Sequence, residues 1–178
     1  ARTPEALPTV RAAVRSADPA AHTARVPHYL IGLVIHHILE NWPWLSLPQV
    51  SLEEKLIQSA RREGIHEPDA VAFVLRKGMR MLDNLRASSL FEDIQQAKQR
   101  FSELPFVLDT PLGKLHGVID LLFQDKDGEW HLMEWKTDWV DEDSYAEKVE
   151  EYRQQIAIYV NAIKEVLGIT PDARLFFL

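Results

Sequence analysis

Two apolar runs joined by a polar turn, between Leu115 and Lys136, carry the clearest pattern of hydrophobic and polar positions in the chain. In each run apolar and polar residues alternate with a period of two, which is typical of a β-strand. The turn Asp125-Lys126-Asp127-Gly128 between them is typical of a hairpin. The pattern therefore predicts two antiparallel strands joined by a short loop, 125–129.

This loop pairs Gln124 with Trp130, so the register places Asp120 directly opposite Glu134, with their Cβ atoms about 5 Å apart. Two facing carboxylates repel each other, and a divalent cation would offset the repulsion because hard cations take carboxylate oxygens as ligands. Lys136 follows on the same face and adds a cationic donor. The alternative is that both acids are solvated on an outer face, but their neighbours there are mainly apolar: Val118, Leu122, Trp130 and Leu132.

Before the hairpin the apolar positions follow a helical spacing. Residues 28–41 predict a helix that Trp42-Pro43 closes, and 52–63 predict a second one. A third helix is expected to begin near Pro68, and a short fourth one, capped by Ser88-Ser89, to run through Lys98. Residues 1–27 contain four prolines among small residues, which predicts a loose lead-in with one short helix near 9–15.

Strands and one long helix account for the rest of the chain. Residues 100–110 predict a strand that Pro105 confines to a sheet edge or a bulge. After the hairpin, 144–167 predict a long helix ended by Gly168, and 173–178 predict a buried strand. The order indicates an α/β fold in which 28–178 form one domain, with a helical part over 28–98 and a sheet and helix over 99–178.

Composition and charge narrow the possible functions. The chain has 178 residues, 46% of them apolar and 26% charged, which suits a globular domain of ordinary size. It has no cysteine, which excludes disulfides, thiolate zinc sites and cysteine-held iron–sulfur clusters, and fits a cytoplasmic location. The net charge of −7 argues against strong non-specific binding of nucleic acid, although a nuclease also needs acids for its metal site. No apolar run is long enough to predict a membrane span.

Several short motifs stand in a fixed order along these elements: Gly32 to Glu40, Ser102 to Phe106, Gly117-Val118-Ile119-Asp120, Glu134-Trp135-Lys136-Thr137 and Gln155 to Tyr159. Together they resemble the PD-(D/E)XK nuclease superfamily over about residues 29–178, and most closely its RecB- and AddA-like nuclease domains. The resemblance implies a restriction-endonuclease-like fold, with a central mixed sheet flanked by helices.

The resemblance also implies roles for individual residues. Asp120 and Glu134 would hold Mg²⁺, or Mn²⁺, with His36 as a further ligand; the register of the helical motif selects His36 and not His37. Lys136 would orient the attacking water or stabilise the transition state. Gln155 and Tyr159, which share a helix face, would position Lys136 and contact the DNA backbone. Without the resemblance, His36 and Tyr159 would be interpreted as core residues and Gln155 as a surface residue.

The implied function is metal-dependent hydrolysis of DNA, as an exonuclease within a helicase-nuclease of DNA-break repair or recombination. Single-stranded DNA ends and a helicase domain, in the same or a partner chain, are the expected partners. The chain has no G-x-x-x-x-G-K-[ST] motif and so no motor of its own, and its start at Ala1 without Met is what we expect of a domain excised from a longer protein. The acidic residues that follow Lys136, over 138–143, lead us to expect weak DNA binding without that partner. Two alternatives stay open: a catalytically inactive relative that binds DNA or protein, and a hydrolase of another phosphoester.

Overall fold

The computed structural model describes residues 26–111, 113–138 and 145–178, which divide into two compact units. The helical unit contains the described residues up to 96 together with 135–138 and 177–178. The sheet unit contains 97–134 and the described residues up to 176. The predicted lead-in and its short helix fall almost wholly outside the described residues, as does the acidic run after Asp138.

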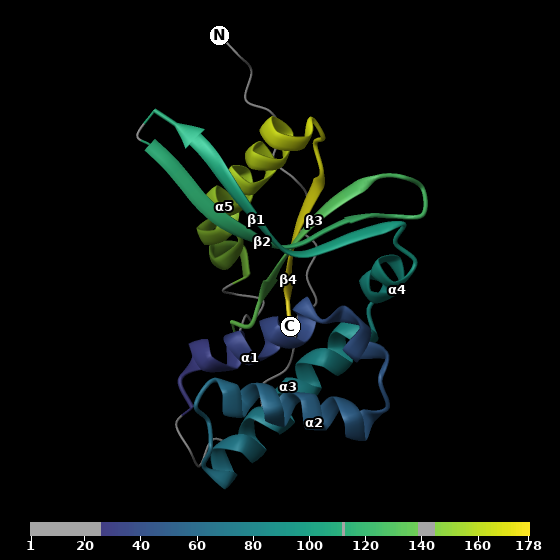
Figure 1. Ribbon diagram of the computed structural model, residues 1–178, viewed down its shortest axis with the longest axis vertical. Coiled ribbons are helices and arrows are strands. Elements are labelled where there is room, and N and C mark those ends of the chain that lie inside the picture. Colours follow the sequence, from purple (N-terminus) through teal and green to yellow (C-terminus); the bar gives the residue numbers. More distant parts are fainter. Residues whose placement is uncertain (1–25, 112, 139–144) are drawn as a thin grey trace. The chain divides into compact units, whose positions relative to one another are not determined.

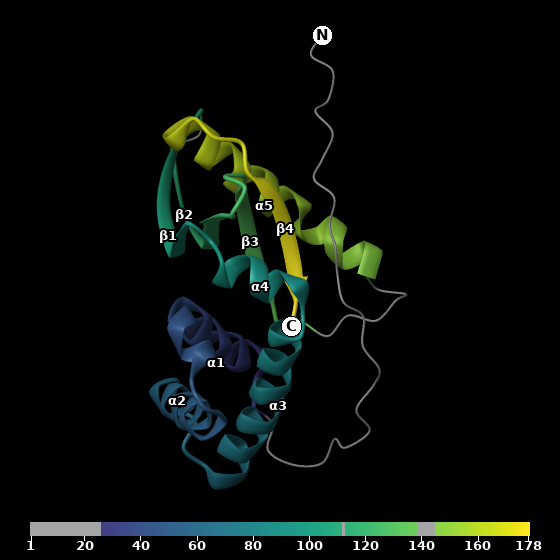
Figure 2. The same ribbon diagram turned by 90° about the vertical axis from the view of Figure 1, so that its right-hand side faces the viewer.

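The helical unit consists of four α-helices and one 3-10 helix (Figures 1 and 2). Their bounds are α1 His28–Glu40, η1 Trp42–Ser46, α2 Gln49–Arg62, α3 Pro68–Arg86 and α4 Ser89–Gln95. The four helices predicted between residues 28 and 98 are present, and η1 was not predicted. Helix α4 ends three residues before Lys98. The side chain of Ser88 accepts a hydrogen bond from the backbone N–H of Phe91, so Ser88 is the N-cap of α4. The helices enclose a core of buried aliphatic side chains, among them Ile35, Ile38, Leu52, Leu56 and Leu82.

The sheet unit is built on four strands in the order β1-β2-β3-β4. Their bounds are β1 Gln99–Thr110, β2 Gly113–Gln124, β3 Trp130–Lys136 and β4 Asp172–Phe177. The pairs β1–β2 and β2–β3 are antiparallel, whereas β3 and β4 run in the same direction (Figure 1). The sheet is therefore mixed, as predicted, and Pro105 lies on the edge strand β1, where a missing backbone donor costs least.

The β2–β3 hairpin has the predicted register. Gln124 pairs with Trp130, and the side chain of Asp125 accepts hydrogen bonds from the backbone N–H groups of Asp127 and Glu129, both at 2.9 Å. Gly128 has a φ of 96°, a conformation that favours glycine. The described pairing ends at Leu121 and Met133, one residue short of the two acids.

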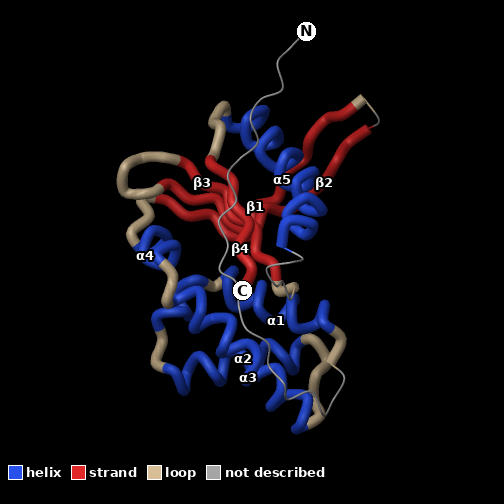
Figure 3. Tube along the Cα trace, turned by 180° about the vertical axis from the view of Figure 1, so that it is seen from behind, coloured by secondary structure: helices blue, strands red, loops and turns tan. Residues whose placement is uncertain are grey.

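Helix α5, Tyr145–Leu167, connects β3 to β4 and lies against one side of the strands of its unit (Figures 1 and 3). Gly168 follows it with a φ of 71°, and its backbone N–H donates to the carbonyl of Lys164, which confirms the predicted helix end. The helix buries Ile156, Ala162 and Ile163 in the core of this unit. Among the described residues, no helix is long and apolar enough to cross a membrane.

Candidate functional site

The two acids of the hairpin are buried in the sheet unit. Asp120 on β2 is 8% exposed and Glu134 on β3 is 4% exposed. The alternative of two solvated acids on an outer face is therefore wrong. Their apolar surroundings are less continuous than expected, because Val118 is 43% exposed while Leu122 and Leu132 are fully buried. Buried carboxylates require hydrogen bonds or cationic partners, since their desolvation is costly.

Gln155 on α5 binds one of these acids directly. Its side-chain amide donates to Oε1 of Glu134 at 2.8 Å and to the hydroxyl oxygen of Tyr159 at 2.7 Å. The shared face of Gln155 and Tyr159 that the i, i+4 spacing predicted is present. Gln155 on α5 thus binds the carboxylate of a residue on β3 that lies 21 positions earlier in the chain.

The phenol of Tyr159 lies among carboxylates. Burial is the main reason that its pKa is raised above the ordinary value, and the negative charges of Glu134, Asp120 and Glu103 raise it further. The hydrogen bond from Gln155 opposes this shift. Tyr159 therefore keeps its proton at neutral pH and remains a neutral hydroxyl beside three acids.

Glu103 on β1 is the acid to which the sequence assigned no role. Its carboxylate lies within 4.8 Å of that of Asp120. Its backbone φ of 49° is rare for a residue other than glycine, and it interrupts the β1–β2 pairing between Ser102 and Leu104. Such strain is often found at functional sites. A sequence signal existed, because Glu103 lies within the motif Ser102 to Phe106, but only the β1–β2 register brings it to Asp120.

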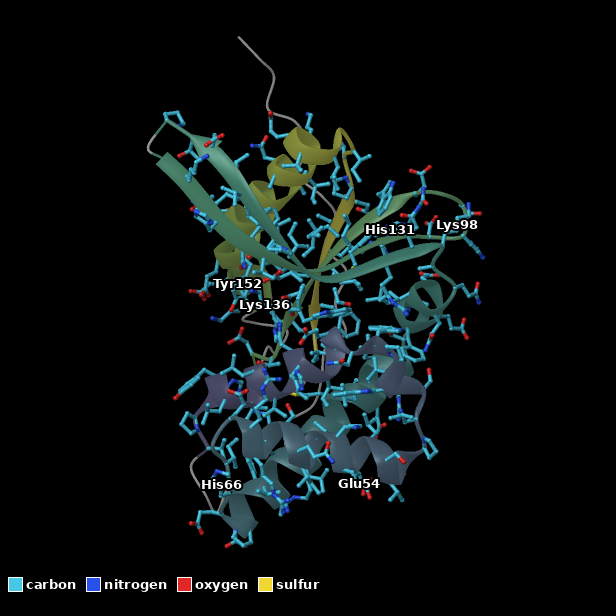
Figure 4. The ribbon with its side chains drawn as sticks, in the orientation of Figure 1. Glu54, His66, Lys98, His131, Lys136 and Tyr152 are labelled. Atoms are coloured by element: carbon cyan, nitrogen blue, oxygen red, sulfur yellow. The ribbon has the colours of Figure 1, made fainter. Side chains whose placement is uncertain are left out.

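The other two predicted residues belong to the helical unit. Lys136, which is labelled in Figure 4, is the last residue of β3 and is half-buried. The alternation along a strand puts it on the same face as Glu134. Its backbone carbonyl accepts a hydrogen bond from the N–H of Leu178 at 2.9 Å. His36 is half-buried on α1, and its role as a metal ligand stays a prediction.

The neighbouring His37 has different surroundings. Its ring meets the ring of Trp44 edge-on at 5.6 Å, and a guanidinium nitrogen of Arg62 lies 3.3 Å from both ring nitrogens. Both partners belong to the helical unit, where Trp44 is half-buried and Arg62 is exposed. The sequence left His37 as either a structural or an exposed residue, and these contacts give it packing partners within the helical unit.

The donor set of the sheet unit fits a hard divalent cation. Asp120 and Glu134 are buried, Glu103 is half-buried, and all three offer carboxylate oxygens, the ligands that Mg²⁺ and Mn²⁺ prefer. There is no cysteine in the chain to favour a softer metal. The arrangement can hold a cation beside a hydrogen-bonded amide and a neutral phenol.

Comparisons with known proteins match this chain to one family model and to several curated relatives. A family model described as the PD-(D/E)XK nuclease superfamily matches residues 10–178. An ATP-dependent helicase/nuclease subunit from Carboxydothermus hydrogenoformans is 26% identical over 157 residues, which cover 78% of this chain and 13% of that protein. The protein of the same name from Alkaliphilus oremlandii is 27% identical over 156 residues, covering 77% of this chain and 12% of that protein.

The chain thus spans only a small part of these curated relatives. A solved structure, that of protein VC1899 from Vibrio cholerae, aligns with 88% of this chain and 49% of its own, with a TM-score of 0.32 and 13% identity. That likeness is too low to carry a conclusion.

Proposed function

We propose that this chain, which belongs to the PD-(D/E)XK nuclease superfamily, hydrolyses DNA phosphodiester bonds with Mg²⁺ or Mn²⁺ as its cofactor. The observation that carries the proposal is the pair of buried acids, Asp120 and Glu134, the second of them held by Gln155. Acids buried on neighbouring strands are costly, and binding a cation compensates that cost.

The acids and His36 would hold the cation. Asp120 and Glu134 supply carboxylate oxygens, Glu103 lies beside Asp120, and His36 is the ligand that the family motif suggests. When bound, the cation supplies a water of lowered pKa and neutralises negative charge on the phosphate. Gln155 keeps the Glu134 carboxylate in one orientation by donating to its Oε1.

Lys136 and the α5 residues would act on the substrate. Lys136 donates hydrogen bonds to the water or to the charge that develops on the phosphate. Tyr159 keeps its proton beside three acids, so its hydroxyl can donate to a phosphate oxygen of the DNA backbone. Neither residue reads base edges, and we expect little sequence preference.

We further propose that the chain acts as an exonuclease on single-stranded ends, with a helicase domain in the same or a partner chain, in DNA-break repair or recombination. The support is that its relatives are called helicase/nuclease subunits and that it spans 12–13% of their length. The net charge of −7 gives no general attraction to DNA, so a helicase would supply the effective concentration of the strand. A cytoplasmic location stays a prediction.

The test is cleavage of labelled linear and circular DNA, single- and double-stranded, in Mg²⁺, Mn²⁺ or EDTA. We expect slow cleavage of linear single strands that EDTA abolishes and that Asp120→Ala lacks. Resistance of circular single strands would support an exonuclease. If no DNA is cleaved with either metal while the chain is folded, the proposal is refuted, and the two alternatives that remain are a catalytically inactive scaffold for DNA or protein binding and a hydrolase of another phosphoester.

A further inference from the structure

We infer that Phe106 on β1 is a positioning residue for the acidic site, and that its ring holds Glu134 in place through Tyr159 and Gln155. The catalytic part of this inference rests on the proposed nuclease function, whereas the contacts themselves lie within the sheet unit. The glycine at position 117 is required because the Phe106 ring lies where a side chain would be.

The room for the ring comes from Gly117 on β2, the residue that pairs with Phe106. A Cβ atom at Gly117 would lie 2.4 Å from Cζ and 2.5 Å from Cε1 of the Phe106 ring, too close for any real Cβ contact. Gly117 does not have a positive φ, so an alanine could adopt its backbone conformation. The glycine is therefore explained by the space that the ring needs.

The ring meets Tyr159 at a defined angle. The two ring centroids are 5.4 Å apart and the planes make an angle of 74°, an edge-to-face pair, which aromatic rings favour. Tyr159 accepts the hydrogen bond from Gln155, whose amide also donates to Glu134. A continuous series of contacts thus runs from the edge strand to the buried acid of β3.

Phe106 is buried at a place where β1 has no continuous hydrophobic core around it. It is 8% exposed, whereas its neighbours along the strand, Pro105 and Val107, are both exposed. On its own face, Leu104 and Leu108 are only half-buried. The ring packs against Tyr159, so removing the Phe106 ring mainly changes the surroundings of the Tyr159 phenol.

The test compares Phe106→Leu with Phe101→Leu in the full chain. Phe101 lies on the same strand, is 43% exposed, and stacks on Trp130 at 6.3 Å, with no part in the contacts to Tyr159. Both variants lose a ring from β1, so Phe101→Leu controls for a general effect on the strand. The first readout is the side-chain amide signal of Gln155 in a ¹H–¹⁵N NMR spectrum, assigned with Gln155→Ala.

We expect the Gln155 amide signal to move toward that of a free amide in Phe106→Leu and to stay unchanged in Phe101→Leu. We also expect kcat for DNA cleavage to fall about fivefold to tenfold in Phe106→Leu, which corresponds to about 1 to 1.4 kcal/mol. The KM for DNA should stay within about twofold of wild type, because the ring does not touch the substrate. Phe101→Leu should retain the wild-type kcat.

A double-variant cycle tests the pairing with Gly117. Gly117→Ala alone should lower both the melting temperature and kcat, since its methyl group displaces the ring. Leucine lacks the Cε1 and Cζ atoms, so in Gly117→Ala/Phe106→Leu the melting temperature should return to that of Phe106→Leu, while kcat stays low. Additive losses would show that Gly117 is needed for another reason.

The outcomes separate the two claims. An unchanged Gln155 signal in Phe106→Leu overturns the inference whether or not the chain cleaves DNA. A shifted signal in Phe106→Leu, combined with a wild-type chain that cleaves nothing, would leave the positioning role in place and refute the nuclease function. Equal losses of kcat in Phe106→Leu and Phe101→Leu would show that Phe106 only contributes to packing of β1, and would overturn the inference.

Discussion

Removing one carboxylate from the acidic site should have opposite effects with and without a divalent cation. Asp120→Asn keeps the shape of the side chain and removes its charge. In the wild-type chain the carboxylate oxygens of Asp120 and Glu103 lie within 4.8 Å. Two unit charges at that distance repel by about 3 kcal/mol at an effective dielectric of about 20. Glu103 is half exposed to solvent, which reduces the figure.

In EDTA, therefore, the melting temperature of Asp120→Asn should equal or exceed that of wild type. With Mg²⁺ at about one hundred times its Kd, binding stabilises the folded wild-type chain by about 2.7 kcal/mol. For a chain of this size that raises the melting temperature by about 5–11 °C. The melting temperature of Asp120→Asn should rise far less with Mg²⁺, because an amide oxygen is a weaker ligand than a carboxylate oxygen.

The assay is thermal unfolding followed by circular dichroism, in EDTA and across a Mg²⁺ titration. Asp109→Asn is the matched control, since Asp109 is exposed on β1 and forms its ion pair with Lys114 at the surface. It should behave like wild type in both conditions. Equal Mg²⁺ stabilisation of wild type and Asp120→Asn would refute Asp120 as a ligand. A drop of several degrees in EDTA would show that partners within the protein already compensate its charge.

Three further predictions concern Lys136 and the turn residue Asp125. Lys136→Ala should abolish Mg²⁺-dependent cleavage without changing the circular dichroism spectrum; cleavage at the wild-type rate would contradict its transition-state role. The hydrogen bond from His131 lowers the pKa of Asp125 to about 2, so this carboxylate stabilises the fold above its unfolded pKa of about 3.9 and the effect is lost as pH falls toward 2. Asp125→Asn should accordingly lower the urea midpoint at pH 6, and the difference from wild type should vanish near pH 2; a constant difference would refute this. Finally, Lys136→Ala in Ca²⁺ should bind single-stranded DNA weakly and in a salt-sensitive way at physiological salt, and nanomolar affinity would show that no helicase partner is needed.

Among the described residues, local pattern was enough to predict the five α-helices, the four strands and the register of the hairpin, but not the 3-10 helix η1. The five-residue loop follows from the turn residues Asp125 to Gly128, and it aligns β2 with β3 so that Asp120 and Glu134 face the same way. The shared face of Gln155 and Tyr159 follows from helical geometry alone. These features depend on residues close in sequence, because the period of a strand or helix determines the direction in which each side chain points.

Contacts between distant segments were not predictable in the same way. That Gln155 binds Glu134, that Glu103 approaches Asp120, and that Phe106 lies over Gly117 each depend on how β1 and α5 pack on the hairpin. The exposure of Val118, against its apolar character, has the same origin. The side-chain period of a strand, 2 residues, or of a helix, 3.6 residues, determines which face a residue lies on. Which other residues cover that face depends on the packing of the whole fold.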